Sequence, residues 1–314
     1  MSQPEVLQII EMPEAPQAAA EAAFTLHKLY AAADREALLA AATPNARAIL
    51  TNGHLGAGRA LMERLPKLEI VGCYGVGVDA VDLDAARDLG VRVTNTPDVL
   101  TDAVAELGVA LLLDVARKVS YNDRYVRAGR WRKEGDPPLG RSLAGRRIGI
   151  VGLGRIGRAT AARLAPFGVE VSYHGPRRKA DAEYPYYDDL VAMAREVEVL
   201  MITCVGSPAT AGMVTAEAIE ALGPDGWLIN MSRGFVVDEA ALVEALAGGR
   251  LGGAGLDVFL HEPDVPAPLL AMDNVVLQPH QASGTVETRT AMGMLTVENL
   301  KAHFAGRPLP TPVV

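Results

Sequence analysis

Cysteine is almost absent from this chain of 314 residues, which contains only Cys73 and Cys204. Each of the two stands at the end of an apolar run of the kind that forms a buried strand. Buried thiols are therefore expected, rather than a disulfide or a metal site. The sequence accordingly predicts no metal, and the cytoplasm is the expected compartment.

Long apolar runs are also absent, and so is any excess of positive charge. No stretch of about 18 apolar residues occurs, so no membrane span is expected. The first residues, Met1–Glu5, lack the basic region and the apolar stretch of a signal peptide. The formal net charge of -8 argues against a surface for nucleic acid or a polybasic membrane anchor. We therefore expect neither nucleic acid nor a membrane as a partner.

The chain does have a globular composition, with strands and helices that alternate along it. With 49% hydrophobic and 22% charged residues, a chain of this length favours two domains. The alternation predicts an α/β fold with two doubly wound parallel sheets flanked by helices. The expected strands are Val6–Ile10, Ala46–Thr51, Leu68–Cys73 and Val91–Thr94 in one sheet, and Arg147–Val151, Val169–Tyr173, Val197–Thr203, Trp227–Met231, Ala254–Asp257 and Val275–Gln278 in the other.

Two long helical patterns flank the second sheet. One runs from about Thr101 to Arg127 and precedes a loop rich in Pro and Gly at 134–145. The other, at about 284–304, follows the completed second sheet and can pack back on the first one. The expected domains are a discontinuous 1–100 plus 285–314, and 101–284.

A glycine-rich turn, Gly152-Leu153-Gly154-Arg155-Ile156-Gly157, follows the strand that ends at Val151. The spacing G-x-G-x-x-G is a weak signal alone, but here a strand leads into it and a helix leads out, as in a dinucleotide-binding fold. The first glycine permits the tight turn, the second lets the backbone approach a pyrophosphate, and the third lets helix and strand pack closely. The helix N-terminus offers N–H groups to the phosphates. The Arg155 side chain is either a further phosphate contact or a solvated surface group.

The segment after the next strand indicates which dinucleotide binds. An NAD site uses an Asp or Glu about 20 residues beyond the turn to accept both ribose hydroxyls. No acid stands there, because Glu170 lies too early in the strand. His174, Arg177, Arg178 and Lys179 occupy this segment and suit a 2′-phosphate, although a solvated basic loop is the alternative. NADP(H) is therefore the preferred cofactor, with NAD(H) possible.

Three polar residues, Arg233, Glu262 and His280, follow three different strands of the second sheet. Ligands of open parallel sheets bind at the carboxyl ends of the strands. Taken singly, these residues are equally well explained as a surface Arg, a solvated Glu and a core His. Together, in a cofactor-binding sheet, they predict one catalytic site.

The order of these motifs resembles the D-isomer-specific 2-hydroxyacid dehydrogenase family over nearly the whole chain. The basic segment after Tyr173 is similar to that of the NADPH-dependent glyoxylate and hydroxypyruvate reductase branch. Several independent motifs in family order make the resemblance specific. The segments that carry it are Gly75–Asp79, Thr101–Glu106, the glycine-rich turn, Asn230–Gly234, Gly255–Phe259, Glu262–Pro263 and Pro279–Ser283.

The resemblance implies two Rossmann-like domains with an active-site cleft between them, the first domain binding substrate and the second binding the dinucleotide. It implies hydride transfer from NADPH to the carbonyl carbon of a small 2-oxo acid, which gives the D-2-hydroxy acid. His280 would then donate a proton as general acid, with Glu262 orienting its ring. Arg233 would polarise the carbonyl and hold the substrate carboxylate.

Further contacts follow from the same resemblance. The backbone N–H groups of Val76 and Gly77, together with the turn at Gly53, would bind the substrate. Asp257 would bind the nicotinamide amide. A homodimer is implied, packed through the helix that begins near Thr101. The other expected cofactor contacts are Cys204, Thr210, Met231 and Ser283.

Two departures from the family pattern and two open alternatives remain. Val205–Pro208 replaces a segment that usually begins with Pro, and Gln281 stands where an apolar residue is common. Glyoxylate or hydroxypyruvate is the first expectation for the substrate, and a bulkier 2-oxo acid such as hydroxyphenylpyruvate is the alternative. A non-enzymatic dinucleotide sensor of the corepressor kind is the alternative from another class. Asp79 is expected to cap the helix that follows it.

Overall fold

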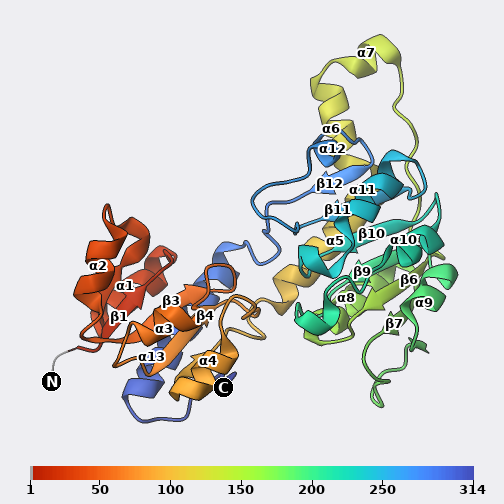
Figure 1. The fold of residues 1–314 in the computed structure, drawn as a ribbon. Coiled ribbons are helices and arrows are strands. Elements are labelled where there is room, and N and C mark those ends of the chain that lie inside the picture. The colour runs from red at the N-terminus through yellow and green to blue at the C-terminus, as the bar shows by residue number, and fades with distance from the viewer. Residues whose placement is uncertain (1–2) are drawn as a thin grey trace. The chain divides into compact units, whose positions relative to one another are not determined.

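The computed structural model describes residues 3–314, and these form two compact units (Figure 1). The first unit contains the chain up to Leu100 together with Gly284–Val314, and the second contains Thr101–Ser283. Each unit is built on one parallel sheet, so the two-sheet α/β class predicted from the sequence is confirmed. Among the described residues, no helix is both long and apolar enough to cross a membrane.

The first unit has a five-stranded sheet in the order β2-β1-β3-β4-β5, with every neighbouring pair parallel. Its strands are β1 (Glu5–Gln8), β2 (Thr25–Lys28), β3 (Ala46–Asn52), β4 (Ile70–Tyr74) and β5 (Arg92–Thr94). Its helices are α1 (Glu14–Ala23), α2 (Arg35–Ala42), α3 (Arg59–Glu63), α4 (Leu83–Leu89) and α13 (Val286–Phe304), with a 3-10 turn η1 (Leu29–Ala31).

The helix α13 returns from the far end of the sequence to complete the first unit (Figure 1). It packs on β4 at Gly72, where a β-carbon would lie 3.1 Å from the Cγ2 atom of Thr296. The last residues then run antiparallel to β5, and the Val313 N–H donates to the Val93 carbonyl oxygen at 2.7 Å. Both segments belong to the core of the first unit although some 200 residues separate them from it in sequence.

The second unit has a seven-stranded parallel sheet in the order β12-β11-β10-β9-β6-β7-β8. The chain leaves β6 toward one edge and later returns to β9 on the other side of β6. Ligands of doubly wound sheets bind at such a switch point, outside the carboxyl ends of the strands. The strands are β6 (Arg147–Val151), β7 (Glu170–His174), β8 (Tyr186–Tyr187), β9 (Val199–Ile202), β10 (Trp227–Asn230), β11 (Gly253–Leu256) and β12 (Val275–Leu277).

Helices cover both faces of this sheet, as expected for a buried parallel sheet. The longest of them, α5, lies against β10, β11 and α8. The helices are α5 (Thr101–Arg117), α6 (Val119–Arg127), α7 (Arg130–Glu134), α8 (Arg155–Leu164), α9 (Leu190–Glu196), α10 (Ala216–Leu222), α11 (Glu239–Ala247) and α12 (Ala267–Leu270), with 3-10 turns η2 (Ala165–Phe167), η3 (Pro208–Thr210) and η4 (Gly234–Val236).

The structure corrects the expectation of one continuous helix over 101–127. That helix is interrupted at Lys118, whose φ of 55° lies in the left-handed region. Ser120 then donates both its N–H and its hydroxyl to the Asp114 carboxylate, which fixes the start of the second segment, α6. Ser and Asp side chains compete with helical hydrogen bonds in this way.

Three smaller expectations were also wrong. The strands β2 and β8 were not predicted, so the second sheet has seven strands rather than six. β8 contains only two residues, too few to give a periodic signal. Asp79 does not cap α4, because the cap is Asp82, whose carboxylate accepts from the Ala85 N–H at 2.8 Å.

Candidate active site

The glycine-rich turn joins β6 to α8, and each of its glycines meets a different steric demand. Gly152 has a φ of 99°, and a β-carbon there would lie 2.5 Å from the Cα atom of Cys204. At Gly157 a β-carbon would lie 2.3 Å from the Gly152 carbonyl oxygen, so the helix can pack this closely only without a side chain. At Gly154, by contrast, no atom lies within 4 Å of the β-carbon position. This open position at the N-terminus of α8 fits the pyrophosphate of a dinucleotide.

The two residues between the glycines differ in their surroundings. Leu153 is buried in the core with Ile150 and Tyr173, so its side chain faces the protein rather than a ligand. Ile156 is half-buried, whereas Arg155 is exposed as the first residue of α8.

The end of β7 carries no acidic side chain. Glu170 is the first residue of this strand and His174 is the last, so roughly 13 Å separate the only acid of the strand from its carboxyl end. The His174 ring donates its Nδ1–H to the Tyr187 carbonyl oxygen at 3.0 Å. Arg177 and Arg178 follow on an exposed loop. The carboxyl end of β7 therefore presents only neutral or positive side chains.

Two tyrosines hold this basic loop in place. The Tyr173 hydroxyl accepts from the Lys179 N–H at 2.7 Å, and the Tyr186 hydroxyl donates to the Gly175 carbonyl oxygen at 3.0 Å. The two tyrosine rings pack with their centroids 5.2 Å apart. The loop is thus ordered by its own chain, while its two arginines remain exposed.

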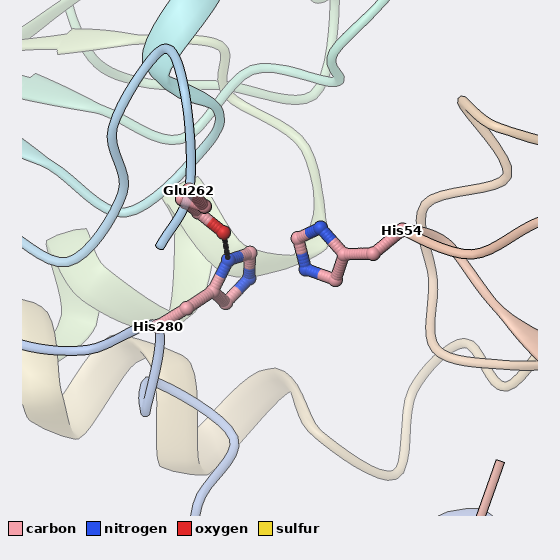
Figure 2. Close-up of side chains that lie close together, drawn as sticks. All are labelled: His54, Glu262 and His280. Carbon is pink, nitrogen blue, oxygen red and sulfur yellow. Dashed lines mark hydrogen bonds and ion pairs between the residues drawn. The ribbon is translucent and has the colours of Figure 1, made fainter. Parts of the chain in front are cut away.

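Glu262 and His280 form a hydrogen-bonded pair beyond the carboxyl ends of β11 and β12. The distance from Glu262 Oε2 to His280 Nδ1 is 2.8 Å, and Figure 2 shows the two side chains joined in this way. The other carboxylate oxygen, Oε1, accepts from the Phe259 N–H at 3.0 Å. The Glu262 and His280 side chains are 21% and 26% exposed, so the pair is shielded but reachable from solvent.

His280 has a φ of 53°, a left-handed conformation that is uncommon for residues other than glycine. Asp257 holds this turn from the neighbouring strand. Its carbonyl oxygen accepts from the His280 N–H at 2.9 Å, and its carboxylate accepts from the N–H groups of Gln281 at 2.7 Å and Ala282 at 2.9 Å. Unusual backbone conformations persist where the surroundings hold them, and they are frequent at functional sites.

Asp257 is fully buried, and this burial raises the pKa of its carboxyl group, while the N–H groups of Gln281 and Ala282 partly offset the rise. Sequence reasoning missed this contact with the turn. The signal was an acid at the end of one strand with a catalytic candidate at the end of the next. The predicted contact between Asp257 and the nicotinamide amide stays a prediction.

Arg233 follows β10, at the same edge of the sheet. Its Nη1 donates to the Ser232 carbonyl oxygen at 2.7 Å, and the Asn230 amide donates to the Arg233 carbonyl oxygen at 3.0 Å. Ser232 in turn donates its hydroxyl to the Cys204 carbonyl oxygen at 2.5 Å. The structure therefore places Arg233, Glu262, His280 and the glycine-rich turn at the carboxyl edge of one sheet.

The other expected cofactor contacts lie in loops at this edge. Cys204 is half-buried, and burial raises the pKa of its thiol, which disfavours a reactive thiolate. Thr210 closes a capping box with Ser207, and Met231 is buried against Gly108. Ser283 lies in the turn after Ala282 and is half-buried.

The expected substrate contacts outside this sheet belong to the first unit. Gly53 lies in the turn after β3, where the Asn52 side chain accepts from the N–H groups of His54 and Leu55. Val76 and Gly77 lie half-buried in the turn after β4.

Comparison with known proteins identifies the family. Residues 109–282 match the family model described as D-isomer specific 2-hydroxyacid dehydrogenase, NAD binding domain. The chain belongs to this family. It is 49% identical over 291 residues to a hydroxyphenylpyruvate reductase of Plectranthus scutellarioides, covering 93% of each chain. It is 45% identical over 294 residues to a glyoxylate/hydroxypyruvate reductase A of Arabidopsis thaliana, covering 94% of each.

Solved structures of the family also match this chain over its whole length. A 2-hydroxyacid dehydrogenase from Ketogulonicigenium vulgare matches with a TM-score of 0.93 and 51% identity, over 100% of this chain and 99% of that one. An NADPH-dependent glyoxylate/hydroxypyruvate reductase from Sinorhizobium meliloti, in complex with NADP and malonate, matches with a TM-score of 0.91 and 41% identity, over 100% and 97%. The protein is thus an NAD(P)-dependent D-2-hydroxyacid dehydrogenase, an oxidoreductase, as the sequence predicted. These relatives disfavour the non-enzymatic sensor.

Proposed function

We propose that this dehydrogenase uses NADPH to reduce a small 2-oxo acid, glyoxylate or hydroxypyruvate, to the 2-hydroxy acid, which has the D configuration when its C2 atom is chiral. The observation that carries the proposal is the Glu262–His280 pair at 2.8 Å, in the same unit as Arg233 and the glycine-rich turn. A carbonyl reduction needs a proton donor in a fixed orientation and a cation near the carbonyl oxygen. The His280 ring and the Arg233 guanidinium can fill these two roles.

NADPH, when bound, would supply a hydride to the carbonyl carbon, and residues of the protein would stabilise the negative charge that develops on the carbonyl oxygen. His280 protonates that oxygen through Nε2, because Nδ1 is engaged by Glu262. Glu262 fixes the ring orientation and stabilises the protonated ring, since its second oxygen is itself held by the Phe259 N–H. Arg233 polarises the carbonyl and pairs with the substrate carboxylate.

The first unit supplies the rest of the proposed substrate site, namely the N–H groups of Val76 and Gly77 and the turn at Gly53. The open β-carbon position at Gly154 and the N-terminus of α8 are proposed to hold the pyrophosphate. The remaining proposed cofactor contacts are Arg155, Ile156, Cys204, Thr210, Met231, Asp257, Ser283 and, through its backbone only, Leu153.

The preference for NADPH is supported by the carboxyl end of β7. No acid stands there to accept ribose hydroxyls, and the exposed Arg177 and Arg178 lie on a loop that two tyrosines hold in place. A guanidinium binds phosphate oxygens in pairs and therefore suits a 2′-phosphate. The Sinorhizobium meliloti relative is described as NADPH-dependent.

A bulkier aromatic substrate is the second candidate, because the relative with 49% identity is a hydroxyphenylpyruvate reductase. The test is steady-state kinetics with glyoxylate, hydroxypyruvate and 4-hydroxyphenylpyruvate, each with NADPH and with NADH. We expect the highest kcat/KM for a small acid with NADPH. Chiral chromatography of the product from hydroxypyruvate should show the D configuration. A higher kcat/KM for the aromatic acid would favour the second candidate, and no turnover of any acid would refute both.

A homodimer is proposed as well. Large apolar side chains are exposed on α6, α7 and the loop after them, with Trp131 58% and Leu139 91% exposed. We take these exposed apolar side chains as support for an interface, because large exposed apolar patches mark interaction sites. The expected interface thus includes α6, α7 and their loop in addition to α5. Leu139→Asp should lower the mass seen by analytical ultracentrifugation from that of a dimer to that of a monomer, and a wild-type monomer would contradict the proposal.

A further inference from the structure

The turn after β4 is held through a reciprocal pair of hydrogen bonds. The Gly75 N–H donates to the Thr96 hydroxyl oxygen at 3.0 Å, and the Thr96 N–H donates to the Gly75 carbonyl oxygen at 2.8 Å. Thr96 is fully buried, and Gly75 has a φ of 146°. The first residue of the turn is therefore fixed to the segment that follows β5.

The next two residues of the turn have their carbonyl groups bound by side chains. The Val76 carbonyl oxygen accepts from the Asn95 side-chain amide at 2.9 Å, and the Gly77 carbonyl oxygen accepts from the Cys73 thiol at 3.4 Å. Within residues 3–314, by contrast, no protein acceptor meets the N–H groups of Val76 and Gly77. Anchored carbonyls with successive unpaired N–H groups make an anion-binding concavity.

Asn95 itself is held by the last segment of the chain. The Thr311 hydroxyl donates to the Asn95 carbonyl oxygen at 2.6 Å, and the Asn95 N–H donates to the Thr311 carbonyl oxygen at 3.3 Å. Thr311 is fixed in turn by the fully buried Asn299 of α13. The Asn299 amide donates to the Thr311 hydroxyl at 2.8 Å, and the Asn299 carbonyl oxygen accepts from the Thr311 N–H at 3.1 Å.

We propose that Asn95 and Thr311 are positioning residues for the substrate, which set the direction of the Val76 and Gly77 N–H groups through a continuous polar chain. Asn299 and Thr311 orient Asn95, and Asn95 orients the peptide between Val76 and Gly77 by holding its carbonyl group. The N–H of Gly77 belongs to that same planar peptide, so its direction follows from the Asn95 contact. This inference rests on the proposed function, because the anion at the turn is taken to be the carboxylate of the 2-oxo acid.

The test compares Thr311→Val, which removes the hydroxyl, with Thr311→Ser, which keeps it. We expect Thr311→Val to raise KM for the 2-oxo acid on the order of tenfold, as for a weakened hydrogen bond to a charged group. The kcat value should change by less than about twofold, because the groups that transfer the proton lie in the other unit. Thr311→Ser should restore KM. The dissociation constant of NADPH, measured by fluorescence without substrate, should stay unchanged in both variants.

Asn95→Asp is a second variant, which replaces the amide donor with an oxygen and should raise KM at least as much. Thr43→Val is the matched control, because it also removes a hydroxyl that donates to a backbone carbonyl in the first unit, at Leu39. KM values of Thr311→Val and Asn95→Asp equal to that of Thr43→Val would overturn the inference while the proposed function stands. A wild-type enzyme that reduces no 2-oxo acid would overturn the proposed function, and this inference with it.

Discussion

The backbone N–H of His280 donates to the carbonyl oxygen of Asp257 across 2.9 Å, so the turn after β12 is tied to the residue after β11. The Asp257 carboxylate takes up the next two N–H groups of the same turn. The position of the proposed acid is therefore set by the neighbouring strand as well as by its partner Glu262. A buried acid can serve this purpose because its charge is met by backbone donors.

His280→Ala should lower kcat by roughly 10² to 10⁴-fold, because the transition state then lacks its proton donor. The dissociation constant of NADPH, measured by fluorescence, should stay within about twofold, since the glycine-rich turn is untouched. Unchanged kcat would remove His280 from the role of general acid.

Glu262→Gln should lower kcat while KM for NADPH is preserved. The amide keeps the size of the side chain and an oxygen for the Phe259 N–H, but it loses the negative charge opposite His280 Nδ1. The protonated ring is then stabilised less. Single-turnover kinetics would separate this effect from product release, and a kcat equal to that of the wild type would detach Glu262 from the chemistry.

Arg177→Ala combined with Arg178→Ala should raise KM for NADPH far more than KM for NADH, because only NADPH carries the 2′-phosphate. Arg195→Ala with Arg250→Ala is a matched control that removes two partly exposed arginines elsewhere in the same unit. Equal losses for both cofactors would contradict the proposed role of the basic loop.

Gly154→Ala should weaken cofactor binding, whereas Gly157→Ala should destabilise the fold. At Gly154 the new methyl group meets no protein atom within 4 Å, so the midpoint of thermal unfolding should stay while NADPH affinity falls. At Gly157 it would lie 2.3 Å from the Gly152 carbonyl oxygen, so the protein should be destabilised even without cofactor. Calorimetry without NADPH gives the midpoint of thermal unfolding, and the shift of that midpoint when NADPH is added reports the affinity for NADPH. A Gly154→Ala variant with wild-type NADPH affinity would place the pyrophosphate elsewhere.

The buried carboxyl of Asp257 predicts a pH dependence of stability. Burial raises its pKa in the folded protein above the value in the unfolded chain, so the folded state binds this proton more tightly. The resulting stabilisation is fully present below the unfolded pKa and is lost as the pH rises through the folded pKa. The free energy of unfolding of the wild type, relative to Asp257→Asn, should therefore fall as the pH rises from the acid range. Denaturant titrations at several pH values test this, and a difference that does not vary with pH would contradict it.

Elements with a clear local pattern could be predicted from the sequence. The bounds of β6 were predicted without error, because a continuous apolar run ends at a glycine whose φ is positive. The placement of Arg233, Glu262 and His280 beyond three strands of one sheet followed from the rule that polar residues after parallel strands share an edge.

Contacts between distant segments could not be predicted in the same way. The hydrogen bonds of Asp257 to Gln281 and Ala282 join residues 24 and 25 positions apart, and no spacing rule specifies them. The interruption at Lys118 depends on which acceptor Ser120 finds, and Asp114 is six residues away. The cap of α4 was misplaced by three residues because two aspartates, Asp79 and Asp82, precede the same helix.

The return of α13 to β4 also has a consequence for how the chain is made. During synthesis, the first hundred residues leave the ribosome without the helix that covers β4 at Gly72. The second unit is continuous in sequence and can complete its core before α13 exists. The first unit therefore cannot finish folding before α13 has been translated, and its apolar surface on β4 stays uncovered until then.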